Sequence, residues 1–245
     1  MDGRQQGDDR SGQPLYQDGW ANNPDFMPGD SNPYGLATAP GVAYMVDGGS
    51  NTLTWVPRRG TPRVIAAFPN PGPFPDPDPQ HTFDAVPTCV TPVGGHDDVD
   101  DERDDQSLDR GRPGPRNNKV VVADLNGRIF VVDGSSITVA AASVTRVDGA
   151  FFAGAGGCVA DGKGNVYITD IFAGGLVKPN LASMELSWVR PPGTFNFPTG
   201  VTIGKGGRLY VANNGVCPES PTPVAPLPDV NPCAGVTGEL VRLNP

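Results

Sequence analysis

The chain has 245 residues, a formal net charge of −9 at pH 7 and 37% hydrophobic residues. Its 33 Gly and 28 Pro fill about a quarter of the positions, which argues against long helices because both residues destabilise helix interiors. The acidic balance argues against a nucleic-acid partner, which needs a basic surface. No apolar run is long enough to span a membrane as a helix, and the polar start lacks the apolar core of a signal peptide.

Four segments of the sequence share one order of short apolar runs and glycine turns. Each begins with a small residue and a short alternating run, then passes through a Gly-rich turn. A second apolar run follows and ends in Asp or Asn. A third run is present in all four segments, and a fourth in the first three. Short β-branched or aromatic runs between Gly turns are typical of antiparallel strands.

The expected strands follow one another in the same order in every repeat. In the first repeat (31–70) they are 35–37, 44–47, 53–56 and 64–68, and in the second (85–144) they are 89–91, 121–124, 129–132 and 137–144. In the third repeat (150–190) they are 158–160, 167–170, 176–177 and 185–189, and in the fourth (197–245) they are 200–202, 210–213 and 240–243.

Four strands in a repeat of about 40–50 residues are typical of one blade of a β-propeller. A single blade cannot bury both of its faces, so blades must stack on one another. A two-sheet sandwich is the alternative, but it would not require equivalent strands to share a sequence. We therefore expect an all-β propeller of four-stranded blades, as a partial, open arc of about four blades. The fourth repeat lacks its last strand, which leaves open edges that other chains can pair with.

Several segments interrupt this pattern. We expect residues 1–30 to be a poorly ordered N-terminal extension, and 94–118 to be a disordered acidic insertion in the second blade. The spacing of the acids in that insertion does not match an EF-hand calcium loop. Proline-rich stretches link the first two blades at 69–79 and form an insertion at 216–236 in the fourth.

Candidate ligand-binding residues recur where the second strand of each blade ends. They are Asp47, Asp124, Asp170 and Asn213, with the nearby Asn51, Asn126 and Asn214. A ring of carboxylates and amides at the mouth of a central channel suits a polar ligand or a hard cation such as Ca²⁺. The alternative is turn chemistry, because Asp and Asn bond their own backbone at hairpins. Repetition in every blade favours the structural alternative, so we assign no metal site and no cofactor.

The four cysteines form no CxxC pair, and with two histidines they nearly exclude a structural zinc site. Cys217 and Cys233 flank the Pro-rich insertion and are candidates for a disulfide that would contribute about 3 kcal/mol. Cys89 and Cys158 fall at matching positions in the first strands of neighbouring blades. We expect such strands to lie too far apart for a disulfide, and therefore predict two buried thiols.

The chain resembles the ScyD/ScyE family of NHL-like β-propeller proteins over roughly residues 20–245. The resemblance rests on the motifs at 22–25 (NNPD), 31–37 (SNPYGLA), 85–88 (AVPT), 197–200 (FPTG), 209–211 (LYV) and 238–243 (GELVRL). The family is named after genes found with biosynthesis of the cyanobacterial pigment scytonemin. Its members are usually longer and often carry an export signal, so the resemblance implies missing N-terminal blades and an extracytoplasmic location in relatives.

No arrangement of residues indicates a catalytic site. We expect a non-catalytic binding or scaffold protein, which in relatives takes part in the handling of secondary metabolites and here binds a small molecule or a protein. A metal-dependent hydrolase of the lactonase type is the first alternative, although none of the four Glu (Glu102, Glu185, Glu219 and Glu239) falls at the expected axis. A fragment of a larger propeller without activity of its own is the second.

Overall fold

The computed structural model describes residues 31–68, 85–93, 119–133, 136–139, 152–213 and 238–243. Fifteen strands, labelled β1 to β15, and one short 3₁₀ turn, η1, lie in these ranges. The strands are β1 (Pro33–Ala39), β2 (Val42–Asp47), β3 (Thr52–Pro57), β4 (Arg63–Ala67), β5 (Pro87–Val93), β6 (Lys119–Asp124), β7 (Ile129–Asp133), β8 (Ser136–Val139), β9 (Ala155–Ala160), β10 (Val166–Asp170), β11 (Gly175–Asn180), β12 (Glu185–Arg190), β13 (Gly200–Ile203), β14 (Leu209–Asn213) and β15 (Glu239–Leu243), with η1 at Lys205–Gly207.

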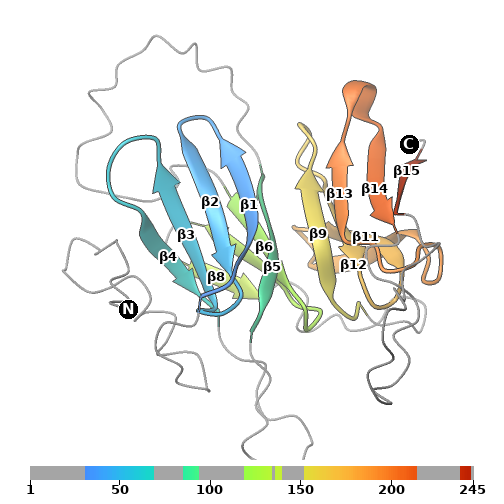
Figure 1. Cartoon of the computed structure of the whole chain (residues 1–245), viewed down its shortest axis with the longest axis horizontal. Helices are drawn as coiled ribbons and strands as arrows, with labels where there is room; N and C mark the ends of the chain where they lie inside the picture. Colours follow the sequence, from blue (N-terminus) through green and yellow to red (C-terminus); the bar gives the residue numbers. More distant parts are fainter. Residues whose placement is uncertain are drawn as a thin grey trace, which may run out of the picture.

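The strands form four separate antiparallel sheets, and each sheet is one of the expected repeats. Their orders are β1-β2-β3-β4, β5-β6-β7-β8, β9-β10-β11-β12 and β13-β14-β15. Every strand pairs with its neighbour in the sequence, as expected for a hairpin meander. No α-helix occurs in the part of the chain that the structure describes, which confirms the all-β class. We call the sheets blades 1 to 4, from the blue strands to the orange and red strands of Figure 1.

The hydrophobic core lies between the blades, in three layers that each join two consecutive sheets. Phe68 of blade 1 and Phe130 of blade 2 meet in the first layer, with ring centroids 4.8 Å apart. Val121 of blade 2 and Ile168 of blade 3 belong to the second, and Leu176 of blade 3 and Val211 of blade 4 to the third. Because side chains alternate along a strand, each blade contributes one set of residues to the layer before it and another to the layer after it.

Glycines on the first strands allow these strands to approach the next blade closely. A side-chain carbon on Gly35 of β1 would lie 2.9 Å from the carbonyl oxygen of Thr88 in blade 2. One on Gly157 of β9 would lie 2.9 Å from the Cα atom of Gly200 in blade 4. Real side-chain carbons almost never come so close to backbone atoms, so the junctions between blades require glycine at these two positions.

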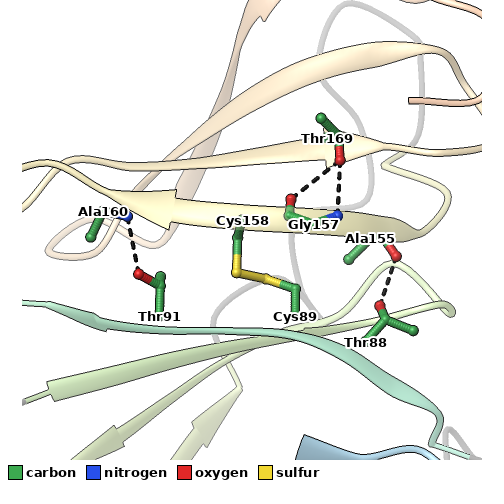
Figure 2. Close-up of a disulfide and its surroundings, with 8 residues drawn as sticks. All are labelled: Thr88, Cys89, Thr91, Ala155, Gly157, Cys158, Ala160 and Thr169. Atoms are coloured by element: carbon green, nitrogen blue, oxygen red, sulfur yellow. Dashed lines mark hydrogen bonds between the residues drawn. A yellow bond between two sulfur atoms is a disulfide. The ribbon is translucent and has the colours of Figure 1, made fainter. Parts of the chain in front are cut away.

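The prediction that Cys89 and Cys158 are unlinked thiols is wrong, because the two residues form a disulfide between β5 and β9 (Figure 2). Their Cα atoms are 5.6 Å apart, within the range that a disulfide requires. The strand register explains the error. Cys89 pairs with Ala123, which directly precedes Asp124, whereas Cys158 pairs with Ile168, two residues before Asp170. The two cysteines are therefore offset by one position, and alternation points them at each other rather than in the same direction.

Two threonines flank the disulfide and bind the backbone of β9 across the junction. The Thr88 hydroxyl donates to the carbonyl oxygen of Ala155 at 2.7 Å, and the Thr91 hydroxyl oxygen accepts from the Ala160 amide at 3.0 Å (Figure 2). Blades 2 and 3 are thus held together at their first strands by a covalent bond and two hydrogen bonds.

The remaining expectations about segments lie outside the described residues. These are the N-terminal extension (1–30), the acidic insertion (94–118) and the Pro-rich insertion (216–236) with Cys217 and Cys233. Blade 4 has three strands in the described ranges, as the sequence indicates. Within those ranges, no helix is long and apolar enough to cross a membrane.

Replacing both Cys89 and Cys158 by Ala should lower the free energy of unfolding by about 4 kcal/mol, because the bond closes a loop between residues 69 positions apart. Urea denaturation of the oxidised wild type and the double variant measures this difference. The same comparison in the presence of reductant is the control, since reduction should remove most of the difference, and peptide mapping without reductant identifies the linked pairs. A wild type that maps with Cys89 and Cys158 as free thiols contradicts the prediction.

Candidate functional site

The residues that end the second strand of each blade occupy matching corners of the four sheets. Asp47 ends β2, Asp124 ends β6, Asp170 ends β10 and Asn213 ends β14. The three carboxylates are almost fully buried, and Asp124 and Asp170 have no exposed surface. The sequence pattern therefore located a repeated structural feature, and the partners of each side chain show what it does there.

In blades 1 and 3 the carboxylate joins two parts of the backbone. Asp47 Oδ1 accepts from the amides of Gly49 and Ser50 in the following turn, both at 2.9 Å, and from the amide of Asn32 before β1 at 2.8 Å. Asp170 accepts in the same way from Phe172 and Ala173 in its turn. Its other oxygen accepts from Ala153, before β9, at 2.8 Å.

Blade 4 retains the same link with an amide side chain. Asn213 Oδ1 accepts from the amide of Asn196, before β13, at 2.7 Å, while its Nδ2 donates to Glu239 on β15. In three blades the strand-end side chain thus ties the segment before the first strand to the end of the second, and in blades 1 and 3 it also binds the turn that follows. This is turn chemistry extended across the sheet, and it satisfies amides that would otherwise be buried without acceptors.

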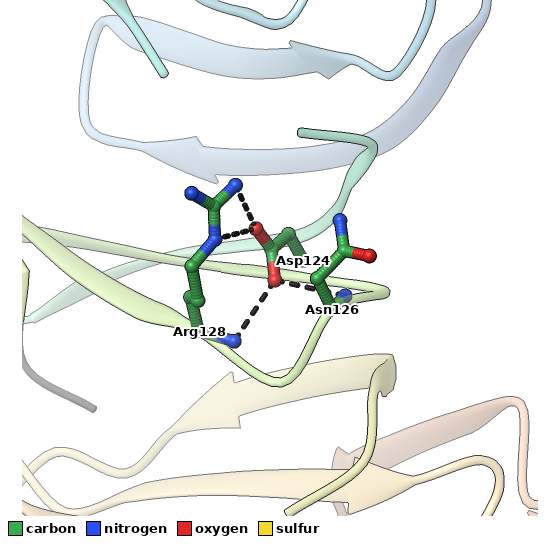
Figure 3. A network of polar contacts seen from close by, with 3 residues as sticks. All are labelled: Asp124, Asn126 and Arg128. Atoms are coloured by element: carbon green, nitrogen blue, oxygen red, sulfur yellow. Dashed lines mark hydrogen bonds and ion pairs between the residues drawn. The ribbon is translucent and has the colours of Figure 1, made fainter. Parts of the chain in front are cut away.

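Asp124 of blade 2 has a different partner, as Figure 3 shows. Its Oδ1 accepts from the amides of Asn126 and Arg128, and its Oδ2 accepts from Arg128 Nε at 2.7 Å and forms an ion pair with Nη2 at 2.6 Å. The Arg128 guanidinium also lies over the Phe130 ring, 5.1 Å from its centroid. Arg128 was not predicted as a site residue, although a basic residue four positions after the strand-end Asp or Asn occurs in no other blade.

Burial opposes the ionisation of Asp124 and Asp170. Desolvation raises the pKa of Asp124 to about 6, and the positive charge and hydrogen bonds of Arg128 only partly oppose it. Burial also raises the pKa of Asp170, against the hydrogen bonds that its oxygens accept from four backbone amides. Both groups are therefore harder to ionise than an exposed aspartate.

The other candidate residues lie in turns or outside the described ranges. Asn51 is buried in the turn after β2 with a positive φ of 57°, and its carbonyl oxygen accepts from the Phe68 amide at 2.8 Å. Asn126 lies in the turn after β6. Asn214, Cys217 and Cys233 lie outside the described residues. No group of three or more His, Cys, Asp or Glu suited to a metal ion occurs in the described ranges.

A hollow of about 420 Å³ lies at the opposite end of blade 3, between the β9–β10 and β11–β12 turns. Asn165, Lys178, Asn180 and Ser187 supply its polar lining. Most of these groups are engaged locally: Asn165 donates to Asp161, Asn180 accepts from the amides of its own turn, and Ser187 donates to the Lys178 carbonyl oxygen. The Lys178 ammonium lies over the Tyr167 ring, 5.9 Å from its centroid, so the hollow provides little for ligand recognition.

Comparison with known proteins identifies the architecture. No protein-family model matches the sequence, and no match was found among curated proteins. Among solved structures, the chain is similar to a catalytically inactive virginiamycin B lyase from Staphylococcus aureus bound to quinupristin. The sequences are 17% identical, the match covers 76% of this chain and 50% of the lyase, and the TM-score is 0.50. A nidogen/laminin complex matches at 17% identity over 75% of this chain and 57% of that chain, with a TM-score of 0.47.

The fold is that of a β-propeller. The chain spans about half the length of the lyase. At this identity the likeness shows the fold alone. In the propeller, the strand-end residues lie at the ends of the second strands, and in blades 1, 3 and 4 their oxygens connect that end to the segment before the first strand. Ligand binding by these residues remains a prediction.

Asp170→Ala should lower the free energy of unfolding by about 3 kcal/mol, because several buried amides lose their charged acceptor together. Asp161→Ala is the matched control in the same blade. Asp161 accepts from the amides of Lys163 and Asn165 in an exposed turn, where water replaces it, so the loss should be about 1 kcal/mol or less. Urea unfolding measures both values, and equal losses would show that the buried link adds nothing.

The raised pKa of Asp124 makes stability depend on pH. The folded chain binds the proton at a pKa of about 6, above the ordinary value of 3.8, so it holds that proton more tightly than the unfolded chain. Lowering the pH from 7 to 4 should therefore stabilise the wild type relative to Asp124→Asn by about 2 kcal/mol. Unfolding free energies of both proteins across this range give the difference, and a difference that does not change with pH contradicts the assignment.

Proposed function

We propose that this chain is a non-catalytic propeller that binds a small molecule or a protein and acts as a scaffold. The observation that supports it is the use of the repeated carboxylates. Asp47, Asp124 and Asp170 direct their oxygens at main-chain amides or at Arg128. The carboxylates that most resemble a group of catalytic residues therefore stabilise the backbone of their own blades.

The resemblance to the ScyD/ScyE family supports a finer version of this proposal, in which the ligand is a secondary metabolite related to scytonemin. The Cys89–Cys158 disulfide supports an extracytoplasmic location, because such bonds form and persist in oxidising compartments.

A metal-dependent hydrolase is the second candidate. The observation in its favour is the pKa of Asp124, since carboxyls with raised pKa values often act as acids or bases in active sites. Against it, Asp124 has no exposed surface and both of its oxygens already accept hydrogen bonds.

Two measurements on the oxidised chain separate the candidates. Titration with scytonemin, followed by tryptophan fluorescence, should give saturable binding, with the urea-unfolded chain as the control for non-specific quenching. Panels of lactones and esters, each with and without Ca²⁺, Mg²⁺ or Zn²⁺, should show no turnover. Turnover that depends on the metal ion would favour the hydrolase over the scaffold protein. Failure of scytonemin to bind would rule out scytonemin as the ligand of the scaffold protein.

A further inference from the structure

Most of the large exposed hydrophobic side chains lie on the two end blades. In the described residues these side chains are Tyr34 (53% exposed) and Leu36 (68%) on β1, Leu240 (66%) on β15, and Phe172 (57%) in a turn of blade 3. The faces that blades 1 and 4 turn away from the arc therefore expose apolar residues of a kind that the junctions between blades cover.

The register shows which residues of the first strands face the next blade and which face the previous one. Gly35, Cys89 and Gly200 pair with the residue directly before the strand-end Asp or Asn, and Gly157 exchanges hydrogen bonds with Thr169 at that position. These four face the next blade. The following residue faces the previous blade, and in blades 1 to 4 it is Leu36, Val90, Cys158 and Val201.

Each junction inside the arc thus places a small residue of one blade against the first strand of the next. Gly35 meets the β5 backbone, Cys89 bonds to Cys158, and Gly157 meets the β13 backbone. Among the described residues, a side-chain carbon on Gly200 would meet only the Ala212 side chain of its own blade, 3.9 Å away. Gly200, the last small residue of the series, is partly exposed at one end of the arc, and Leu36, the first residue that faces a previous blade, is 68% exposed at the other.

Blade 4 also repeats the polar groups that bind blade 3 to blade 2. Residues 87–91 read PTCVT and residues 198–202 read PTGVT. Val86 and Phe197, which precede these segments, both have positive φ, at 26° and 46°. Thr199 and Thr202 therefore occupy the positions of Thr88 and Thr91, whose hydroxyls bind the β9 backbone.

We propose that blade 4 of one copy of this chain docks onto blade 1 of a second copy, with β13 beside β1 as β5 lies beside β9. Leu36 of the second copy fills the space beside Gly200, and Thr199 and Thr202 bind the backbone of β1. Leu240 lies on the same face as Gly200, because both pair with Ala212, and is covered by the same contact.

The contact joins two different surfaces, so it is head-to-tail. It closes into a ring or extends into a filament according to the rotation between copies. It is continuous with the three junctions inside the arc and uses the same pairing of residues, which is why a second copy is the favoured occupant. It requires no ligand and is independent of the proposed binding function.

Sedimentation velocity over a range of concentrations tests the proposal on the full oxidised chain. The wild type should associate as concentration rises, and Leu36→Asp should raise the dissociation constant about tenfold or more by placing a carboxylate in the contact. Phe172→Asp is the matched control, since it changes an equally exposed hydrophobic residue away from the arc ends. A monomeric wild type, as expected if a blade of another protein occupies the surface, or an equal effect of both variants, overturns the proposal.

Mixing experiments test the head-to-tail geometry. Leu36→Cys and Gly200→Cys are made separately in a chain with Cys217 and Cys233 replaced by Ser, then mixed under mild oxidation. The mixture should form a mixed disulfide between the two variants, while each alone should not cross-link. Equal cross-linking of a single variant, as symmetric pairing of β1 with β1 would produce, or no cross-linking in the mixture, overturns the proposal.

Discussion

The close approach of the first strands is the constraint on which the rest of the structure depends. Gly35 and Gly157 allow the backbone of the next blade to come within the distance at which a side chain would clash. This approach brings apolar side chains of consecutive sheets into three continuous layers, in which Leu53, Ile129 and Leu209 are among the buried members. The protein is therefore stabilised between its sheets rather than within them, which is the energetic pattern of a stacked repeat protein.

The strand-end side chains provide hydrogen-bond acceptors for backbone amides that the stacking of the blades buries. Where the chain enters a blade and turns after the second strand, backbone amides are buried among apolar layers. Asp47, Asp170 and Asn213 each supply an acceptor to an amide 15 to 17 residues earlier in the chain, so the start of the blade and the end of its second strand are fixed together. Blade 2 reaches a related result by another route, since Leu125 donates to the Val86 carbonyl oxygen while Arg128 pairs with the carboxylate.

Much of the fold could be predicted from the sequence, because each repeat of the sequence corresponds to one sheet. The four sheets, their three or four strands and the strand-end residues all follow from the recurring order of apolar runs and glycine turns. The disulfide could not be predicted, because turn lengths differ between blades. Ala39 pairs with Val42 across a two-residue turn, whereas Ala160 pairs with Val166 across a five-residue turn. Because of such differences, a shift of one position in strand pairing cannot be seen in an alignment of the repeats. A shift of one position moves a side chain to the other side of the sheet.

The same alternation explains why the ends of the arc resemble its interior. A stacked blade must present one face to the layer before it and another to the layer after it, so every copy of the repeat carries both kinds of face. In the interior blades, Val121 and Val122 are adjacent in the sequence, yet they are buried in different layers. In the end blades one of the two faces lacks this cover, as the exposure of Leu36 and Leu240 shows. Capping repeats of other stacked proteins carry polar outer faces. The outer faces of blades 1 and 4 instead carry apolar residues such as Leu36 and Leu240, as do the faces buried between blades.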